Sequence, residues 1–144
     1  MAIAEQGPRY LDASAITKLI APEVGSTELL VAVADGRPLV SSELVVAEVP
    51  RAVRGIAAEG RLEDVDTALS ELEALLGGFA LVPIGREVLT VAAGFGPHAL
   101  RTLDAIHVAT SLLVEDVHEF VSYDRRQLRA ADEAGLATAS PGWS

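Results

Sequence analysis

The sequence contains no cysteine, a single lysine and few aromatic residues, which make up 4% of the chain. The lack of cysteine excludes disulfide bonds, cysteine-ligated zinc or iron–sulfur sites, and thiol catalysis. No uncharged apolar run reaches the roughly 18–20 residues that span a bilayer. The N-terminal segment also lacks the basic and apolar regions of a signal peptide. We therefore expect a cytoplasmic protein with no membrane contact.

Acidic side chains dominate the charge, with 21 acidic against 11 basic residues and a formal net charge of −10. Half of the 144 residues are hydrophobic, a proportion typical of globular proteins. This length predicts one domain covering residues 1–144. The net charge argues against nucleic-acid binding over the whole surface, because a polyanion is repelled on average. It does not exclude a local site.

Short apolar runs alternate with amphipathic segments along the chain. Strands are expected over residues 9–11, 38–41, 79–84, 120–123 and 136–140. Helices are expected over residues 14–22, 26–36, 42–60, 62–76, 86–96, 100–116 and 125–134. Ser26, Ser42 and Thr102 are the expected N-caps of three of these helices. The alternation predicts an α/β fold with a parallel sheet covered by helices on both faces.

Four carboxylates occupy positions at which such a fold can use them. Asp12 and Asp124 directly follow strands, and ligands of parallel sheets bind beyond the carboxyl ends of strands. Helix capping is a simpler explanation for both residues, and a favourable interaction with the helix dipole is one for Asp104. Glu48 lies among apolar neighbours, where a carboxylate needs a partner.

Together, these acids and the nearby hydroxyls of Ser14 and Ser122 offer a site made only of oxygen ligands. Hard oxygen ligands favour Mg²⁺ or Mn²⁺ over zinc. Ions of this kind activate water and neutralise the charge that develops during phosphodiester cleavage. This chemistry requires neither histidine nor cysteine, so a site made only of acids is compatible with metal-dependent phosphodiester cleavage.

Four segments carry a family resemblance: YLDASAITKL, SSELVVAEVPRA, LRTLDAIHVATSL and FVSYDRRQLRAADEAGLATASP. Their order resembles that of PIN-domain proteins, and more narrowly that of the VapC-type toxins of bacterial toxin–antitoxin pairs, from Tyr10 to Pro141. The resemblance implies a three-layer α/β/α sandwich around a short parallel sheet. It also implies an endoribonuclease that uses Mg²⁺ or Mn²⁺ to cleave structured cellular RNA, forms a homodimer and is held inactive by a cognate antitoxin.

The family's four acidic positions fall on Asp12, Glu48, Asp104 and Asp124, which the resemblance makes the catalytic and metal-binding residues. Its first motif places the supporting hydroxyl on Ser14. All four acids are present, as expected for an active nuclease.

One departure from the family pattern concerns the helix that carries Glu48. Pro50 follows two residues later and predicts a kink, because proline removes a backbone donor and crowds the preceding turn. Glu43 is the alternative if the kink turns Glu48 away.

Basic and aromatic residues near the acids give weaker signals. Arg101 precedes Asp104 by one turn and can pair either with it or with an RNA phosphate. Arg125 and Arg126 follow Asp124 and suit phosphate contacts, although a solvated helix face explains them equally well. His107 is more simply a helix-packing or surface residue than a site residue. The low aromatic content argues against a base-stacking platform.

Other functions remain open at this stage. One is an RNA-processing PIN nuclease without an antitoxin, and another is a non-catalytic binding module. Apolar side chains of the first two helices suit a groove for an antitoxin helix, although ordinary core packing explains most of them: Ile16, Leu19, Ile20, Leu29, Leu30 and Val33. Receiver domains and haloacid-dehalogenase phosphatases need a lysine late in the chain, whereas the only lysine here, Lys18, follows the first strand.

Overall fold

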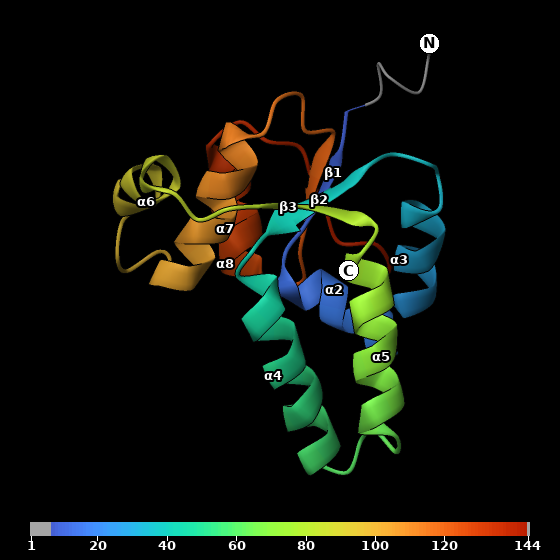
Figure 1. The fold of residues 1–144 in the computed structure, drawn as a ribbon. Coiled ribbons are helices and arrows are strands. Elements are labelled where there is room, and N and C mark those ends of the chain that lie inside the picture. Colours follow the sequence, from blue (N-terminus) through green and yellow to red (C-terminus); the bar gives the residue numbers. More distant parts are fainter. Residues whose placement is uncertain (1–6, 144) are drawn as a thin grey trace.

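Five parallel strands form the centre of the molecule in a computed structural model that describes residues 7–143. The strands are β1 (Arg9–Leu11), β2 (Leu39–Ser42), β3 (Phe79–Val82), β4 (Glu119–Val121) and β5 (Thr138–Ala139). The helices are α2 (Ala13–Ile20), α3 (Ser26–Val33), α4 (Val45–Ala58), α5 (Val65–Leu76), α6 (Arg86–Ala93), α7 (Thr102–Leu113) and α8 (Arg125–Glu133). The spatial order of the strands is β3-β2-β1-β4-β5 (Figure 1).

Helices cover both faces of this sheet, because alternate residues of the central strands point to opposite sides. Tyr10 and Phe120 face α6, α7 and α8, and their rings stack at a centroid distance of 5.3 Å. Leu11 and Val121 face α2, α4 and α5 on the other side. The predicted three-layer α/β/α sandwich is therefore confirmed (Figure 1). Within residues 7–143, no helix is long and apolar enough to cross a membrane.

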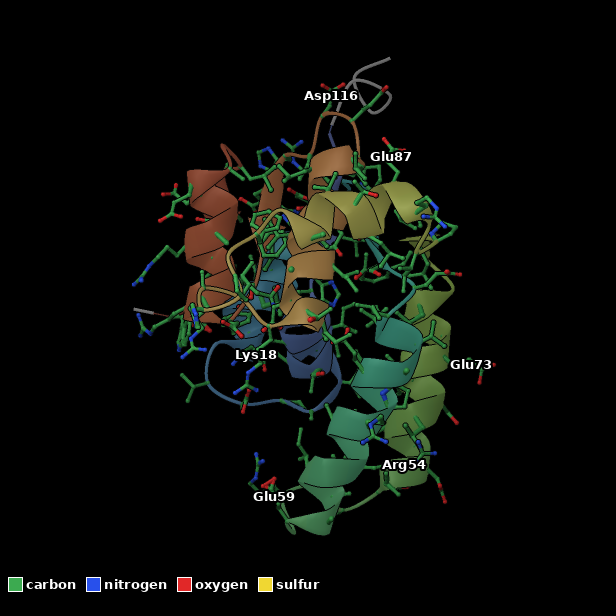
Figure 2. All side chains as sticks on the ribbon, turned by 90° about the vertical axis from the view of Figure 1, so that its left-hand side faces the viewer. Lys18, Arg54, Glu59, Glu73, Glu87 and Asp116 are labelled. Carbon is green, nitrogen blue, oxygen red and sulfur yellow. The ribbon has the colours of Figure 1, made fainter. Side chains whose placement is uncertain are left out.

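The long helices α4 and α5 pack against each other below the sheet (Figure 1). Val45, Val49 and Val53 form the buried stripe of α4 at four-residue spacing. The helix continues through Pro50 to Ala58, and the kink expected at Pro50 stays a prediction. The exposed side chains of the pair, such as Glu73, point outward into solvent (Figure 2).

All three predicted serine and threonine caps are wrong. Ser26 is already the first helical residue of α3 and follows Gly25, whose φ of 93° is left-handed. Ser42 is the last residue of β2, because the helix after it begins only at Val45. Thr102 is likewise the first residue of its helix and not its cap. Two other helices, α2 and α8, have carboxylates as their N-caps, and these are Asp12 and Asp124 of the predicted site.

Candidate active site

The predicted site lies where the strand order changes direction. Within the sheet, β2 and β3 lie on one side of the central strand β1, and β4 and β5 lie on its other side. Crevices beyond the carboxyl ends of strands at such a switch point are the usual ligand sites of parallel sheets. Asp12 follows β1 directly, and Ser122 and Asp124 follow the adjacent β4. The topology therefore brings together residues that are 110 positions apart in sequence.

Asp12 is completely buried, and both of its carboxylate oxygens accept hydrogen bonds. Oδ1 accepts from the Ser14 hydroxyl at 2.7 Å and from the Ala15 backbone N–H at 3.0 Å, and Oδ2 accepts from the Ser122 hydroxyl at 2.7 Å. Burial raises the pKa of Asp12, although nearby His107 and these hydrogen bonds oppose the rise. Asp12 therefore caps α2, as the simpler explanation held, but it also joins β1 to the end of β4.

The hydroxyls of Ser14 and Ser122 fix the neighbouring backbone as well. The Tyr123 backbone N–H donates to Ser14 Oγ at 2.9 Å, and the Asp124 backbone N–H donates to Ser122 Oγ at 3.0 Å. Each serine thus holds Asp12 through its hydrogen and the segment after β4 through its oxygen. This double use explains why hydroxyl residues occur at both positions.

A glutamine that the sequence reasoning overlooked connects two of the acids. Asp124 caps α8 by accepting from the Arg126 and Gln127 backbone N–H groups at 2.9 and 3.2 Å. The Gln127 side chain is buried, and its Nε2 donates to Asp104 Oδ1 at 3.1 Å. The only signal in the sequence is an uncharged polar residue in the strongly charged segment RRQLRAADE. Gln127 therefore positions Asp104 relative to Asp124.

Asp104 experiences the negative charge of the other three acids. Its pKa is raised first by burial, then by the carboxylate of Asp124 and, more weakly, by those of Asp12 and Glu48, while His107 opposes the rise. Like charges that hinder each other's ionisation must lie within electrostatic range of one another. The four acids selected from the sequence thus belong to one electrostatic neighbourhood.

The Glu48 side chain on α4 contacts His107, which belongs to α7. His107 is fully buried; its Nε2 lies 2.7 Å from Glu48 Oε1 and its Nδ1 lies 2.8 Å from the Tyr10 hydroxyl. The ring thus bridges the Glu48 carboxylate and the Tyr10 hydroxyl through its two nitrogens. The packing role expected for His107 is correct but incomplete. The alternative acid, Glu43, instead accepts from the Ile84 backbone N–H at 3.2 Å.

The carboxylate oxygens of these acids suit a hard divalent cation, but the side chains do not yet have the spacing of a complete metal-binding site. Within residues 7–143, no three acidic or histidine side chains have the spacing of a metal-binding group. However, the donor set consists of carboxylates, and the buried Oε1 of Gln127 has no hydrogen-bond partner in the described chain. A cation or its water ligands would satisfy that oxygen and relieve the repulsion around Asp104.

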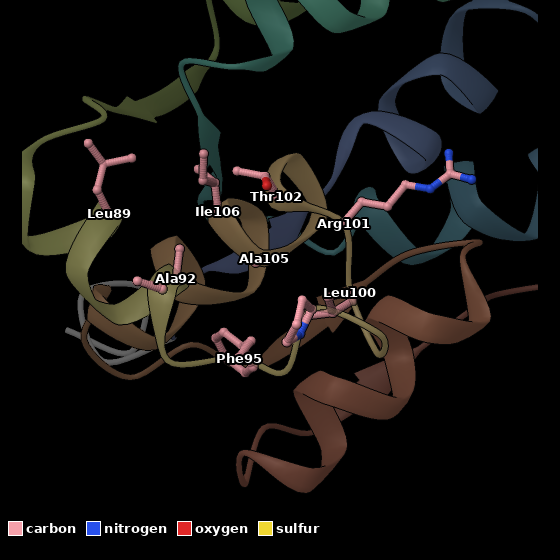
Figure 3. A pocket seen from close by; sticks show the side chains of 10 residues that line it. Leu89, Ala92, Phe95, Leu100, Arg101, Thr102, Ala105 and Ile106 are labelled. Atoms are coloured by element: carbon pink, nitrogen blue, oxygen red, sulfur yellow. The ribbon is translucent and has the colours of Figure 1, made fainter.

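Two surface hollows adjoin this region and differ in character. One, of about 450 Å³, is polar, and its lining comprises Ser14, Arg101, Asp104, Tyr123, Asp124, Arg125 and Arg126. The other, of about 480 Å³, lies between α6 and α7 and has a mainly apolar lining that includes Leu89, Phe95 and Ile106 (Figure 3). The Arg101 side chain points away from those apolar groups (Figure 3). The three arginines expected to contact RNA, Arg101, Arg125 and Arg126, all line the polar hollow.

Comparisons with known proteins show the family of this chain. The PIN domain family model matches residues 9–133. Ribonuclease VapC47 of Mycobacterium tuberculosis (strain CDC 1551 / Oshkosh) is 36% identical over 138 residues, which cover 92% of this chain and 96% of the relative. Ribonuclease VapC46 of M. tuberculosis (strain ATCC 25618 / H37Rv) is 38% identical over 133 residues with the same coverage.

Solved structures share the fold at lower sequence identity. PAE2754 from Pyrobaculum aerophilum gives a TM-score of 0.62 at 21% identity, covering 92% of this chain and 83% of that one. VapBC2 from Rickettsia felis, bound to a DNA fragment from its promoter, gives 0.64 at 12% identity, covering 92% and 97%. Because the family model and the curated relatives both match nearly the whole chain, it belongs to the VapC ribonuclease family of PIN-domain proteins.

Proposed function

We propose that this protein is a divalent-metal-dependent endoribonuclease, the toxin of a toxin–antitoxin pair, that hydrolyses phosphodiester bonds of structured cellular RNA in the cytoplasm. The observation that carries the proposal is the convergence of carboxylates at the switch point of the sheet: Asp12 and Asp124 follow β1 and β4, and Asp104 lines one polar hollow with Asp124. Such a concentration of negative charge suits a cation that in turn binds phosphate. The names of the curated relatives, all ribonucleases, support the choice of RNA.

Asp12, Asp104 and Asp124 would hold Mg²⁺ or Mn²⁺, directly or through water, and Glu48 would complete the site. A bound ion of this type supplies an activated water and stabilises the charge on the leaving oxygen. The remaining residues position these acids: Ser14 and Ser122 orient Asp12, Gln127 orients Asp104, and His107 orients Glu48.

The arginines of the polar hollow would bind the RNA backbone. Arg101, Arg125 and Arg126 line it together with Asp104 and Asp124. Guanidinium groups match the geometry of phosphate oxygens and attract the polyanion locally. In a chain of net charge −10, this restricts RNA binding to the site that cleaves it.

An antitoxin partner is favoured over an antitoxin-free RNA-processing role by the surface of α2 and α3. Ile16, Ile20 and Leu29 are buried in the core, as the simpler explanation of core packing held. Leu30 is 61% exposed, and it lines a hollow of about 160 Å³ together with Leu19. An apolar helix face of an antitoxin would dock here, in line with the toxin–antitoxin complexes among the structural neighbours. Exposed Leu89 and Leu103 support a separate homodimer contact through α6 and α7.

The test compares the wild type with Asp12→Asn. Asparagine keeps the size of the side chain and an acceptor oxygen but removes the charge. Purified wild type should cleave RNA only when Mg²⁺ or Mn²⁺ is added, and its expression should arrest growth. Asp12→Asn should do neither while keeping its circular dichroism spectrum. A folded Asp12→Asn variant with full RNase activity would refute the proposal, and an inert wild type would favour a non-catalytic binding module.

A further inference from the structure

Two aromatic side chains lie directly beside the acidic site. Tyr123 precedes Asp124 in the sequence, and its backbone N–H is bonded to Ser14 Oγ at 2.9 Å. The edge of the Tyr123 ring meets the Trp143 indole at a centroid distance of 5.7 Å and an interplanar angle of 63°. Trp143 remains 37% exposed. The low aromatic content of the chain therefore did not reveal that two of its six aromatic residues meet here.

Trp143 is fixed in place by the turn that carries it. The Tyr123 hydroxyl donates to the Pro141 carbonyl at 2.7 Å. Gly142 has a φ of 78°, and a Cβ added there would lie 2.6 Å from the Cα of Gly25. Only glycine permits this close approach of two backbones. The segment 141–143 thus docks on the loop between α2 and α3, which holds the indole beside Tyr123.

A basic side chain lies over each of the two rings in a cation–π contact. Lys18 Nζ lies 4.3 Å from the centroid of the Tyr123 ring, and Arg125 Cζ lies 4.6 Å from that of Trp143. Such contacts stabilise a cation against an aromatic face. Lys18 is buried and ion-paired with Glu23 at 3.1 Å, whereas Arg125 is exposed and supplies positive charge beside the Trp143 ring. Aromatic rings flanked by cations are typical of surfaces that bind single-stranded nucleic acid.

The surface beside these rings is hollowed. A hollow of about 330 Å³ is lined by Lys18, Glu23, Val24, Tyr123 and Trp143. Binding sites for small ligands occupy roughly 300–1,000 Å³, so this volume suits a single planar group. Val24 is 80% exposed and provides an apolar wall of this hollow. Tyr123 also lines the polar hollow that holds Asp104 and Asp124, so the two hollows adjoin.

We propose that the hollow beside Trp143 binds one unpaired nucleobase of the RNA whose backbone occupies the acidic site, with the base stacked on the indole. This inference rests on the proposed function and adds a subsite that selects for an unpaired nucleotide near the cleaved bond. Sequence-specific proteins commonly recognise RNA at loops and bulges, where unstacked bases are available for aromatic side chains. Arg125, which lines the polar hollow and lies over the Trp143 ring, would contact the phosphate of the same nucleotide.

Trp143 is the only tryptophan of the chain, so its fluorescence reports on this subsite alone. The uncleaving Asp12→Asn protein is titrated with a short single-stranded RNA, and binding is followed in parallel by anisotropy of labelled RNA. We expect saturable quenching with the same Kd in both measurements. Stacking contributes about 1–3 kcal/mol per base, so Trp143→Ala should weaken binding about 5- to 150-fold. Trp143→Phe should retain most of the affinity. Leu113→Ala, a control with the same 37% exposure, should change nothing.

In the active protein, Trp143→Ala should raise KM about tenfold and leave kcat within about twofold, because stacking binds the substrate without contacting the cleaved bond. The inference is overturned if RNA binds without quenching, if RNA fails to bind, or if Trp143→Ala binds as well as the parent. It is also overturned if Trp143→Ala loses antitoxin binding and keeps RNA binding. Unchanged KM with normal cleavage would refute only the subsite, whereas cleavage by Asp12→Asn would refute only the proposed function.

Discussion

Gln127 Nε2 lies 3.1 Å from Asp104 Oδ1, and this bond joins the first turn of α8 to the first turn of α7. The same glutamine presents its backbone N–H to Asp124, so it contacts two of the proposed metal-binding acids at once. Its own Oε1 is buried without a partner in residues 7–143. A buried carbonyl oxygen in that condition costs free energy, and a site that uses the oxygen would explain why it is kept.

Gln127→Met should lower both RNA cleavage and Mg²⁺ affinity. Methionine preserves the volume and apolar packing but removes the donor to Asp104. Loss of a residue that orients a metal ligand typically costs about 10–100-fold in affinity or activity. Steady-state cleavage assays across a Mg²⁺ titration measure the effect, and Arg129→Ala on the exposed side of α8 is the control. Unchanged metal affinity in Gln127→Met would show that Asp104 needs no such support.

His107→Phe should reduce cleavage by releasing Glu48. The phenyl ring fills the buried space but cannot donate to Glu48 Oε1, which now lies 2.7 Å from Nε2. We expect a loss of roughly tenfold, within the range for residues that orient a metal ligand. In a double-mutant cycle, His107→Phe and Glu48→Gln should not be additive, because each breaks the same contact. Full additivity in kcat/KM would mean that the two residues act separately.

Tyr10→Phe, which removes the other His107 contact, should destabilise the fold by about 1 kcal/mol.

Mg²⁺ or Mn²⁺ should raise the melting temperature of the protein. A ligand at 100 times its Kd stabilises the folded state by about 2.7 kcal/mol, which corresponds to a rise of roughly 5–11 °C at this size. Differential scanning fluorimetry with and without each ion measures the shift. Asp12→Asn should reduce it, whereas Glu43→Gln, which changes an acid bonded to the Ile84 backbone, should not. A metal response that survives in Asp12→Asn would place the ion elsewhere.

Asp12→Asn should stabilise the metal-free protein at neutral pH. Burial raises the pKa of Asp12 in the folded state, so the charged form is disfavoured there relative to the unfolded chain. Its contribution is therefore destabilising above the folded-state pKa and fades as the pH falls and the carboxyl group is protonated. Urea unfolding at several pH values in a chelator should show the gain of Asp12→Asn at pH 7 shrinking in acid. A gain independent of pH would contradict this electrostatic origin.

The expectations that rested on the alternation of apolar runs were confirmed, whereas those that rested on capping residues were not. The apolar runs before Asp12 and near Asp124 indicated parallel strands, and the structure places both acids beyond the carboxyl ends of β1 and β4. The serine and threonine caps failed because the chain turns differently at each of them, with Gly25 in a left-handed conformation and Ser42 still within β2. The roles of Asp12, Glu48, Asp104 and Asp124 in catalysis stay predictions.

The sequence by itself predicted the chemical class of the site, because it has no cysteine and places four acids where an α/β fold can use them. It also determined the α/β alternation, since strand and helix periodicities are local properties of the chain. Only the tertiary structure decided how the acids are supported. Gln127 meets Asp104, His107 meets Glu48 and Trp143 meets Tyr123 through the order of the strands and the packing of the layers. Such contacts join residues from different elements, so no local pattern specifies them.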